Sequence, residues 1–454
     1  MLRHFPMVKA FSSGLSSVLS GGADTIVARA TAAGASALAV IRVSGPETCR
    51  LAGLLSPDIN MASPWRAGVV RLHDESGVFL EEAIIIPYRA PRSYTGEDML
   101  ELMVHGSRWI VDAVVGTIIS AGARQAAPGE FTRRAVANGK MDLVQAEAVN
   151  EVIQAETEWQ ARMAREQLHG VLSQEFRALK DALVALLAEV EGSLDFEEQG
   201  VVVDQGAHEA ARKGCVARID TLLVTVGAGV RVREGARVVI VGKPNAGKST
   251  LFNTLLARER AIVAPTPGTT RDVLEAELEI EGLPVILVDT AGLREAEDPT
   301  EAEGVRRARR EEERADLIVA LWDVEDYNTL CFHEFKNTGR RLDIVSKADL
   351  AEQQIEGVLA ISCLTGQGVD QLLEEIHLRV AAPVAAMEGS VAVNLRQAEA
   401  LLRARKCLET LISVPQEVAA LEIRSAMLAL HEILGSLDDN EVLDAVFSSF
   451  CVGK

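Results

Sequence analysis

The stretch VVIVGKPNAGKST at residues 238–250 decides the fold expected for this chain. Residues 238–241 are apolar and β-branched, which predicts a buried strand. The next eight residues fit the pattern G-x-x-x-x-G-K-[ST], a loop whose glycines let backbone N–H groups approach phosphate oxygens. Residues 250–256 continue as a helix whose N-terminus faces those phosphates. This order predicts a nucleotide-binding α/β domain.

Within this loop, Lys248 is placed to reach the β- and γ-phosphates, and Ser249 to bring its hydroxyl to Mg²⁺. A glycine-rich turn before an amphipathic helix is the alternative, and the preceding strand disfavours it. The expected nucleotide contacts of this loop are Asn245, Ala246, Gly247, Lys248, Ser249 and Thr250.

Four further motifs follow in the order found in guanine-nucleotide-binding domains. GTTRD at residues 268–272 offers Thr270 as a second Mg²⁺ ligand, and DTAG at residues 289–292 ends a strand beside the metal and the γ-phosphate. In SKAD, residues 346–349, the Asp349 carboxylate can accept guanine N1–H and the 2-amino group. SCLTG at residues 362–366 can supply a backbone N–H to guanine O6. The expected GTP contacts of these motifs are Thr269, Thr270, Asp289, Thr290, Ala291, Gly292, Ser346, Lys347, Asp349, Ser362, Cys363 and Leu364.

Three positions bear on the mechanism of GTP hydrolysis. Leu293 follows the DTAG motif, where Ras-type GTPases carry a water-orienting glutamine, so other groups must orient the water. Asn245 has a free amide oxygen that could hold a monovalent cation bridging the phosphates. Glu301 could position the water through a second water. On the local pattern alone, an acid favoured by the helix dipole is the simpler interpretation of Glu301.

The flanks predict two further kinds of structure. Before residue 140, strands at 38–43, 83–87 (ended by its proline) and 100–106 alternate with helical segments. Residues 141–198 and 391–454 are predominantly helical, with a weaker helix at 208–226. After the phosphate loop, a hairpin around Glu281-Gly282 and strands near 317–321, 342–345 and 358–361 complete a mostly parallel sheet. The nucleotide domain is therefore expected to be inserted into a helical domain.

The composition excludes several classes of protein. A net charge of −20 argues against binding of nucleic acid over the whole surface, and 4% aromatic residues argue against a base-stacking platform. No C-x-x-C pair or H-E-x-x-H motif suggests zinc, and no apolar run is long enough to span a membrane. Residues 1–22 carry basic and serine residues without an acid. They resemble a transit peptide, but a disordered leader or an over-extended gene start is favoured.

The chain closely resembles the tRNA modification GTPase MnmE (TrmE) family from residue 24 to its end. The specific matches are YTGED at 94–98, PGEFT at 128–132, GKMDL at 139–143, the PNAGKS, GTTRD and DTAGLR segments, and the tail FCVGK at 450–454. The resemblance implies a multidomain α+β and α/β fold: an N-terminal folate-binding α+β domain, an all-α helical domain from two segments, and an inserted Ras-like P-loop GTPase domain. The expected boundaries are leader 1–22, N-terminal domain 23–140, helical segments 141–234 and 386–454, and G domain 235–385.

The same resemblance implies a function. Family members hydrolyse GTP and, with an FAD-dependent partner (MnmG, also called GidA), add an aminomethyl or carboxymethylaminomethyl group to C5 of the wobble uridine (U34) of certain tRNAs. A tetrahydrofolate derivative, 5,10-methylene or 5-formyl, carries the one-carbon unit. The implied partners are GTP or GDP, tRNA, a second copy bound through the N-terminal domain, and the FAD-dependent protein in a heterotetramer. The implied location is cytoplasmic, or mitochondrial if residues 1–22 are a transit peptide.

The resemblance also assigns residues. From composition alone, Arg42, Glu101 and Lys140 are ordinary surface charges and Cys451 belongs to a frayed tail. The family positions make Glu301 and Cys451 catalytic candidates. The implied folate-binding residues are Arg42, Glu101, Lys140 and Lys454, and the implied K⁺ ligands are Asn245, Ala264, Thr266 and Thr269, beside Mg²⁺ at Ser249 and Thr270.

Three positions depart from the family pattern. Ser346 replaces the usual asparagine of the N-K-x-D motif, Ser107 replaces a second glycine after His105-Gly106, and residues 264–266 differ from the commoner potassium loop. The competing hypothesis is a GTPase switch in ribosome assembly, a class that typically carries an appended RNA-binding module.

Overall fold

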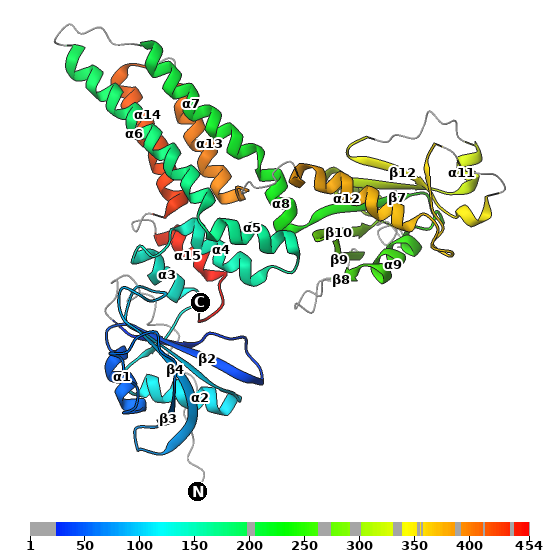
Figure 1. Ribbon diagram of the computed structural model, residues 1–454. Helices are drawn as coiled ribbons and strands as arrows, with labels where there is room; N and C mark the ends of the chain where they lie inside the picture. Colours follow the sequence, from blue (N-terminus) through cyan, green and yellow to red (C-terminus); the bar gives the residue numbers. More distant parts are fainter. Residues whose placement is uncertain are drawn as a thin grey trace. The chain divides into compact units, whose positions relative to one another are not determined.

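A computed structural model describes residues 24–197, 205–261, 274–290, 301–329, 338–351, 355, 357–385, 392–411, 414–435 and 440–453. The chain divides into two compact units, Met1–Glu147 with Leu434–Lys454, and Ala148–Ile433. The helix α4 (Leu143–Gln154) runs across this division. Each unit is described separately, and Figure 1 shows their elements.

The first unit is built on a mixed sheet in the order β3-β4-β5-β2-β1-β6. Two helices, α1 and α2, cover one face, because their apolar residues share a core with inward-facing residues of the strands. The bounds are β1 (Ile26–Arg29), β2 (Ser36–Ser44), β3 (Gly68–His73), β4 (Phe79–Tyr88), β5 (Met99–Gly106), β6 (Arg124–Gln125), α1 (Thr48–Leu55) and α2 (Arg108–Ser120).

The strand predicted to end at Pro87 continues one residue further. β4 reaches Tyr88, and Pro87 pairs with Leu100 of β5. On its other side β4 pairs with β3 only as far as Ile85, so Pro87 lies on an edge where a missing N–H costs little. The prediction of a stop at the proline was therefore wrong.

The C-terminal part of the chain completes the first unit. The helices α3 (Glu130–Ala137) and α15 (Asn440–Ser448) pack near the start of α4. Leu143 shares a small core with Phe447 and Phe450. The residues after Phe450 then meet the N-terminal part of the chain, where Val452 forms an isolated β-bridge with Pro128. Segments more than 300 residues apart thus fold together.

Helices make up the first part of the second unit. The helix predicted at 208–226 is α7, which ends at Val224 because the chain turns at Thr225, whose hydroxyl and N–H both donate to Leu222 O. A further helix, α8, follows this turn and was not predicted. Helices α6, α7, α13 and α14 lie side by side as a bundle (Figure 1). The bounds are α5 (Glu158–Leu168), α6 (Val171–Glu197), α7 (Gln205–Val224), α8 (Val226–Glu234), α13 (Leu395–Thr410) and α14 (Gln416–Leu434).

The rest of this unit is an α/β domain around a sheet in the order β13-β12-β11-β7-β10-β9-β8. The strands pair in parallel from β13 to β10, and β9 and β10 form the expected hairpin. Its bounds are β7 (Ala236–Gly242), β8 (Arg260–Ala261), β9 (Leu274–Ile280), β10 (Leu283–Asp289), β11 (Leu317–Trp322), β12 (Arg341–Val345), β13 (Leu359–Ala360), α9 (Lys248–Arg258), α10 (Glu301–Arg314), α11 (Val324–Thr329), the 3₁₀ turn η3 (Ala348–Leu350) and α12 (Val369–Ala385).

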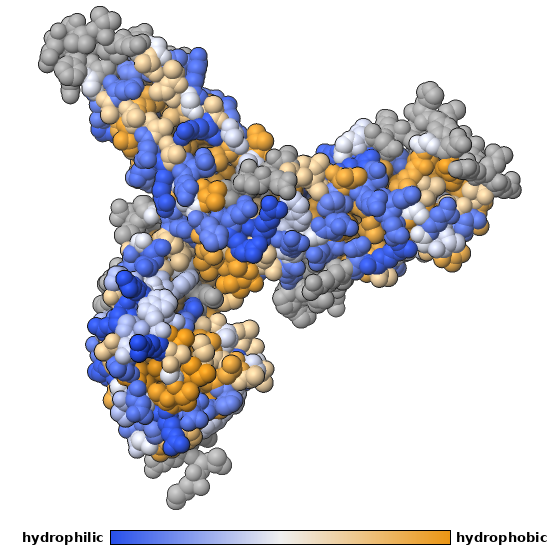
Figure 2. All heavy atoms as spheres, in the orientation of Figure 1, coloured by the Kyte–Doolittle hydropathy of each residue, from blue (hydrophilic) through white to orange (hydrophobic). Residues whose placement is uncertain are grey.

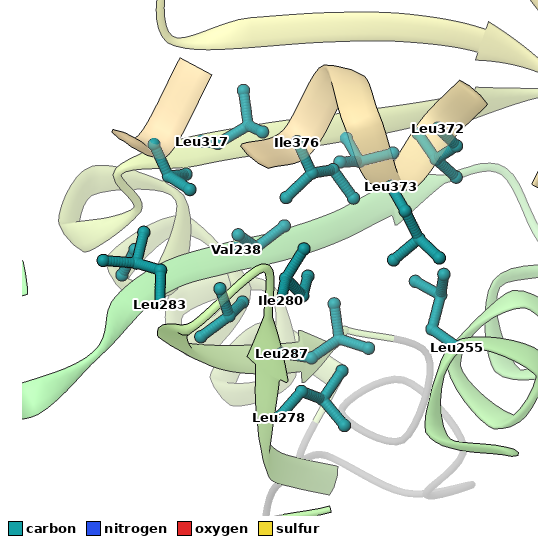
Figure 3. Packing of buried hydrophobic residues seen from close by; sticks show 14 of the residues in the cluster. Val238, Leu255, Leu278, Ile280, Leu283, Leu287, Leu317, Leu372, Leu373 and Ile376 are labelled. Atoms are coloured by element: carbon teal, nitrogen blue, oxygen red, sulfur yellow. The ribbon is translucent and has the colours of Figure 1, made fainter. Parts of the chain in front are cut away.

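Branched aliphatic side chains fill the space between this sheet and its helices. Figure 3 shows Val238 and Leu287 of the sheet facing Leu372, Leu373 and Ile376 of α12. This packing fixes the strand ends from which the nucleotide motifs project. The predicted multidomain α+β and α/β fold is confirmed. Among the described helices, none is long and apolar enough to cross a membrane.

Candidate functional sites

The phosphate loop joins the end of β7 to the start of α9. Gly242 has φ 155°, and a Cβ there would lie 2.6 Å from Leu321 O. Gly247 caps α9 at φ 92°, a left-handed conformation that glycine adopts without strain. Asn245 has φ 65°, which asparagine tolerates better than most other side chains. These values explain why residues of these types occupy the loop.

Two polar groups from separate motifs meet at this loop. Ser249 Oγ donates a hydrogen bond of 2.8 Å to Asp289 Oδ2 at the end of β10. Lys248, almost fully buried, donates from Nζ to Lys243 O at 2.8 Å. A hydroxyl and a carboxylate side by side suit Mg²⁺, which prefers oxygen ligands and often keeps water between itself and a carboxylate. The parallel pairing of β7 and β10 brings them together.

The base-recognition motifs are linked to each other and to the phosphate loop. Ser362 Oγ donates to Asp349 Oδ1 at 2.6 Å and accepts from the Thr365 N–H at 3.2 Å. Ser346, which is buried, donates from Oγ to Ala246 O at 2.6 Å. The serine that departs from the family pattern therefore still ties the base-recognition loop to the phosphate loop.

The guanine loops also involve contacts that the sequence did not indicate. Lys347 has φ 57° and lies 3.7 Å from Asp323 Oδ2 through its Nζ. Burial raises the pKa of the Cys363 thiol, so this cysteine stays protonated beside the expected guanine position. Leu364 is 86% exposed. No spacing rule predicts the partner at Asp323, because it lies on a neighbouring strand end.

A second cluster lies on the sheet of the first unit. Arg42 and Glu101 are direct cross-strand partners on β2 and β5, and Arg42 Nε donates to Glu101 Oε1 at 2.7 Å. The Arg42 guanidinium stacks on the Tyr94 ring at 5.2 Å. Tyr88 donates from its hydroxyl to Glu101 Oε2 at 2.9 Å.

One atom of this cluster has no partner in the described part of the chain. Arg42 Nη1 is buried without a hydrogen-bond acceptor. A buried unsatisfied N–H costs about 1–3 kcal/mol, so its persistence suits a bound ligand that presents an acceptor. Lys140 donates from Nζ to Pro91 O at 3.0 Å.

The C-terminal tail is held against the same unit. The Gly129 N–H donates to Cys451 O at 3.3 Å. Gly453 has φ 96°, and a Cβ there would lie 2.2 Å from Arg29 O. Arg29 is the neighbour on β1 of Ala28, the cross-strand partner of Arg42. The tail therefore packs on β1, the strand that pairs with β2 next to Arg42. Cys451 in this tail is exposed.

Comparisons with known proteins agree over most of the chain. The family description "MnmE helical domain" matches residues 143–451, and "GTP-binding protein TrmE N-terminus" matches residues 25–140. Proteins named tRNA modification GTPase MnmE are similar along their whole length. The relative from Caulobacter vibrioides is 42% identical over 95% of this chain and 100% of its own, that from Aquifex aeolicus 39% over 95% and 100%, and one from Thermus thermophilus 41% over 95% and 99%.

The chain belongs to the tRNA modification GTPase MnmE family. It is therefore a GTP-hydrolysing enzyme of tRNA modification. The hypothesis of a ribosome-assembly switch finds no support in these relatives. Among solved structures, the G domain of the T. maritima FeoB iron transporter covers 33% of this chain and 98% of its own at 23% identity, with a TM-score of 0.24, too low for any inference.

Some residues expected from the MnmE motifs lie outside the described residues. α10 begins at Glu301, but the Glu301 side chain is not described. The predicted positions that lie wholly outside the described residues are Ala264, Thr266, Thr269, Thr270, Ala291, Gly292, Leu293 and Lys454, together with the leader 1–22. Their assigned roles stay predictions.

Proposed function

We propose that this chain is the K⁺-dependent GTPase of an enzyme that, with an FAD-dependent partner, adds an aminomethyl or carboxymethylaminomethyl group to C5 of U34 in certain tRNAs. The observation that carries this proposal is the Arg42–Glu101 pair with the unsatisfied Arg42 Nη1. A carboxylate accepts N–H donors and a guanidinium donates to an acceptor, and the pterin ring of tetrahydrofolate presents both.

The folate-binding residues we propose are Arg42, Glu101, Lys140 and Lys454. Bound tetrahydrofolate, as the 5,10-methylene or 5-formyl form, supplies the one-carbon unit. Arg42 and Glu101 bind and orient its ring, and Lys140 meets its acidic tail from the loop at Pro91. Cys451 is the proposed catalytic residue of this site. It is exposed, and its carbonyl oxygen accepts a hydrogen bond from the Gly129 N–H of this unit. This docking supports a role of the tail at the folate site.

The GTPase site is proposed to use K⁺. Asn245, in its left-handed loop conformation, is the described member of the proposed K⁺ ligand set. A cation bridging the phosphates would neutralise charge in the transition state, as an arginine does in other GTPases. Glu301 at the start of α10 is proposed to position the attacking water. Mg²⁺ is expected at Ser249 and, through water, at Asp289.

A second copy of the chain is proposed to bind through the N-terminal sheet. Helices cover one face of this sheet, and the other face carries an apolar row of Val69 on β3, Ile84 on β4 and the half-buried Met103 on β5. Val69 is 66% and Ile84 40% exposed. Figure 2 shows apolar residues gathered on this unit. Because Arg42 and Glu101 project from the same face by strand alternation, a dimer formed there would enclose the folate site.

The domain limits and location complete the proposal. We keep the boundaries 23–140, 141–234, 235–385 and 386–454, with a leader at 1–22, and a cytoplasmic location unless that leader is a transit peptide. The FAD-dependent partner is proposed to join the dimer in a heterotetramer with tRNA as substrate.

Two experiments test the central proposal, one on folate binding and one on tRNA modification. Isothermal titration of the full chain with 5-formyltetrahydrofolate should show binding that Arg42→Ala abolishes, with Arg108→Ala, an exposed arginine of α2, as the matched control. Nucleoside analysis of tRNA from cells lacking this gene should show loss of the U34 modification. The proposal would be contradicted if Arg42→Ala bound 5-formyltetrahydrofolate as tightly as the unaltered protein, or if the tRNA nucleosides were unchanged.

Potassium dependence has a separate test. Replacing K⁺ with Na⁺ in a GTPase assay should lower the rate strongly, since Na⁺ is too small for a site shaped for K⁺. Glu301→Ala should keep GTP binding and lose most hydrolysis. Equal rates in the two salts would refute the role of Asn245, and unchanged turnover would exclude Glu301.

A further inference from the structure

Tyr88 lies beside the Arg42–Glu101 pair but belongs to none of the family motifs. Its hydroxyl holds Glu101 Oε2 at 2.9 Å, while Arg42 Nε holds Oε1 at 2.7 Å. Each carboxylate oxygen therefore has its own donor, and the plane of the carboxylate is fixed from two sides. Burial, and then the charge of Glu101, raise the pKa of Tyr88 to about 12, so its hydroxyl remains a donor at physiological pH.

Trp65 fixes Tyr88 in turn. The two rings meet edge to face, with centroids 4.8 Å apart and planes at 84°. Trp65 has φ 65°, a region that bulky residues rarely occupy, and its N–H donates to Pro87 O at 2.8 Å. It is nevertheless 61% exposed. Backbone strain retained at an exposed aromatic residue is typical of functional sites rather than of a packed core.

We propose that Tyr88, braced by Trp65, is a positioning residue that aims the Glu101 carboxylate at the N–H donors of a bound pterin ring. This inference rests on the proposed tetrahydrofolate site. A carboxylate has about four lone-pair positions, so Glu101 keeps free acceptor capacity after bonding to Arg42 and Tyr88. A pterin offers two adjacent N–H donors, from its ring nitrogen and its 2-amino group, and only a fixed carboxylate plane meets both.

Calorimetric titration of the full chain with 5-formyltetrahydrofolate tests this role. Tyr88→Phe removes only the hydroxyl and should weaken binding about tenfold, the usual worth of a hydrogen bond to a charged group. In a Glu101→Gln background the same change should cost less than about twofold, because the hydroxyl acts through Glu101. An equal loss in both backgrounds, or no loss in Tyr88→Phe, overturns the inference. Absence of binding by the unaltered protein overturns the folate site itself.

A second pair of variants decides the matter if Glu101→Gln binds too weakly to titrate. Trp65→Ala should weaken folate binding several-fold, and Trp65→Phe should restore most of it, because an aromatic edge again braces Tyr88. Trp109→Ala, at a 68% exposed position of α2, and Tyr327→Phe, in the α/β domain, are matched controls that should bind normally. Equal binding by Trp65→Ala and Trp109→Ala contradicts the proposed brace.

Discussion

At the scale of residues, individual hydrogen bonds orient the side chains expected to contact guanine. Asp349 is exposed, so its carboxylate is free to rotate unless another group orients it. Ser362 supplies that group from a fully buried position, with a hydrogen bond of 2.6 Å. Ser346 donates a hydrogen bond from its hydroxyl to Ala246 O and so connects its own loop to the phosphate loop. We therefore expect guanine selectivity to depend on these two serines as well as on the aspartate.

Ser362→Ala should weaken GDP binding about tenfold, because it removes a hydrogen bond to a charged group that must be oriented. Fluorescence titration with a labelled GDP measures the change. Ser425→Ala is the control, since the Ser425 hydroxyl only donates to Leu421 O on the exposed side of α14. GDP affinity equal to that of the unaltered protein would show that Asp349 needs no such support.

Gly453→Ala should release the C-terminal tail. The new Cβ would lie 2.2 Å from Arg29 O, and φ 96° strains any side chain there. Hydrogen exchange should show faster exchange of the Gly129 amide, which donates to Cys451 O, and tRNA modification should fall. Gly116→Ala is the control, because open space surrounds that position in α2. Unchanged exchange at Gly129 would mean that the tail accommodates a methyl group.

At the scale of elements, a partly buried ionic network joins the start of α3 to β6 and to the segment that leads into β1. Glu130 accepts from Arg124 at 2.6 Å and from Arg134 at 3.0 Å, and both arginines also bond to Asp24. Burial by itself would raise the pKa of Glu130. The hydrogen bonds from Arg124 and the Ala127 N–H, with the two arginine charges, outweigh it and hold the pKa below the ordinary 4.5.

Glu130→Gln should destabilise the first unit by about 2 kcal/mol, because it removes the charge of a buried carboxylate that accepts hydrogen bonds from two arginines. Since the folded pKa is the lower one, ionised Glu130 stabilises the fold above pH 4.5, and this contribution is lost as the pH falls through the folded pKa. As the pH is lowered from neutral to below 4.5, the melting temperature should therefore fall less in Glu130→Gln than in the unaltered protein. Glu47→Gln, in an exposed pair with Arg50, should change little. Equal effects of the two substitutions would contradict the assigned role of burial.

At the scale of the whole molecule, the open face of the N-terminal sheet should govern assembly. The double variant Val69→Asp with Ile84→Asp places two charges in the exposed apolar row and should convert a dimer into monomers. Light scattering after size-exclusion chromatography measures the mass. Leu54→Asp is the control, since Leu54 is 51% exposed on α1, which covers the opposite face. A variant that remains dimeric would place the interface elsewhere.

The sequence by itself determined the nucleotide domain and its ligand. The phosphate loop and the motifs after it are contiguous, and their chemistry demands particular residue types at fixed spacing, so they can be read before folding. Apolar periodicity likewise predicted the hairpin around Glu281-Gly282, because a local pattern sets it. The family resemblance then assigned Arg42 and Glu101, which composition alone would leave as surface charges.

Only the tertiary structure decided which of these groups meet. Sheet register places Arg42 opposite Glu101, and parallel pairing brings Ser249 to Asp289. Long-range packing seats the tail at Gly453 on Arg29 and brings Tyr88 to Glu101. Such contacts depend on the free energy of the whole fold rather than on any short segment, and no local pattern encodes them.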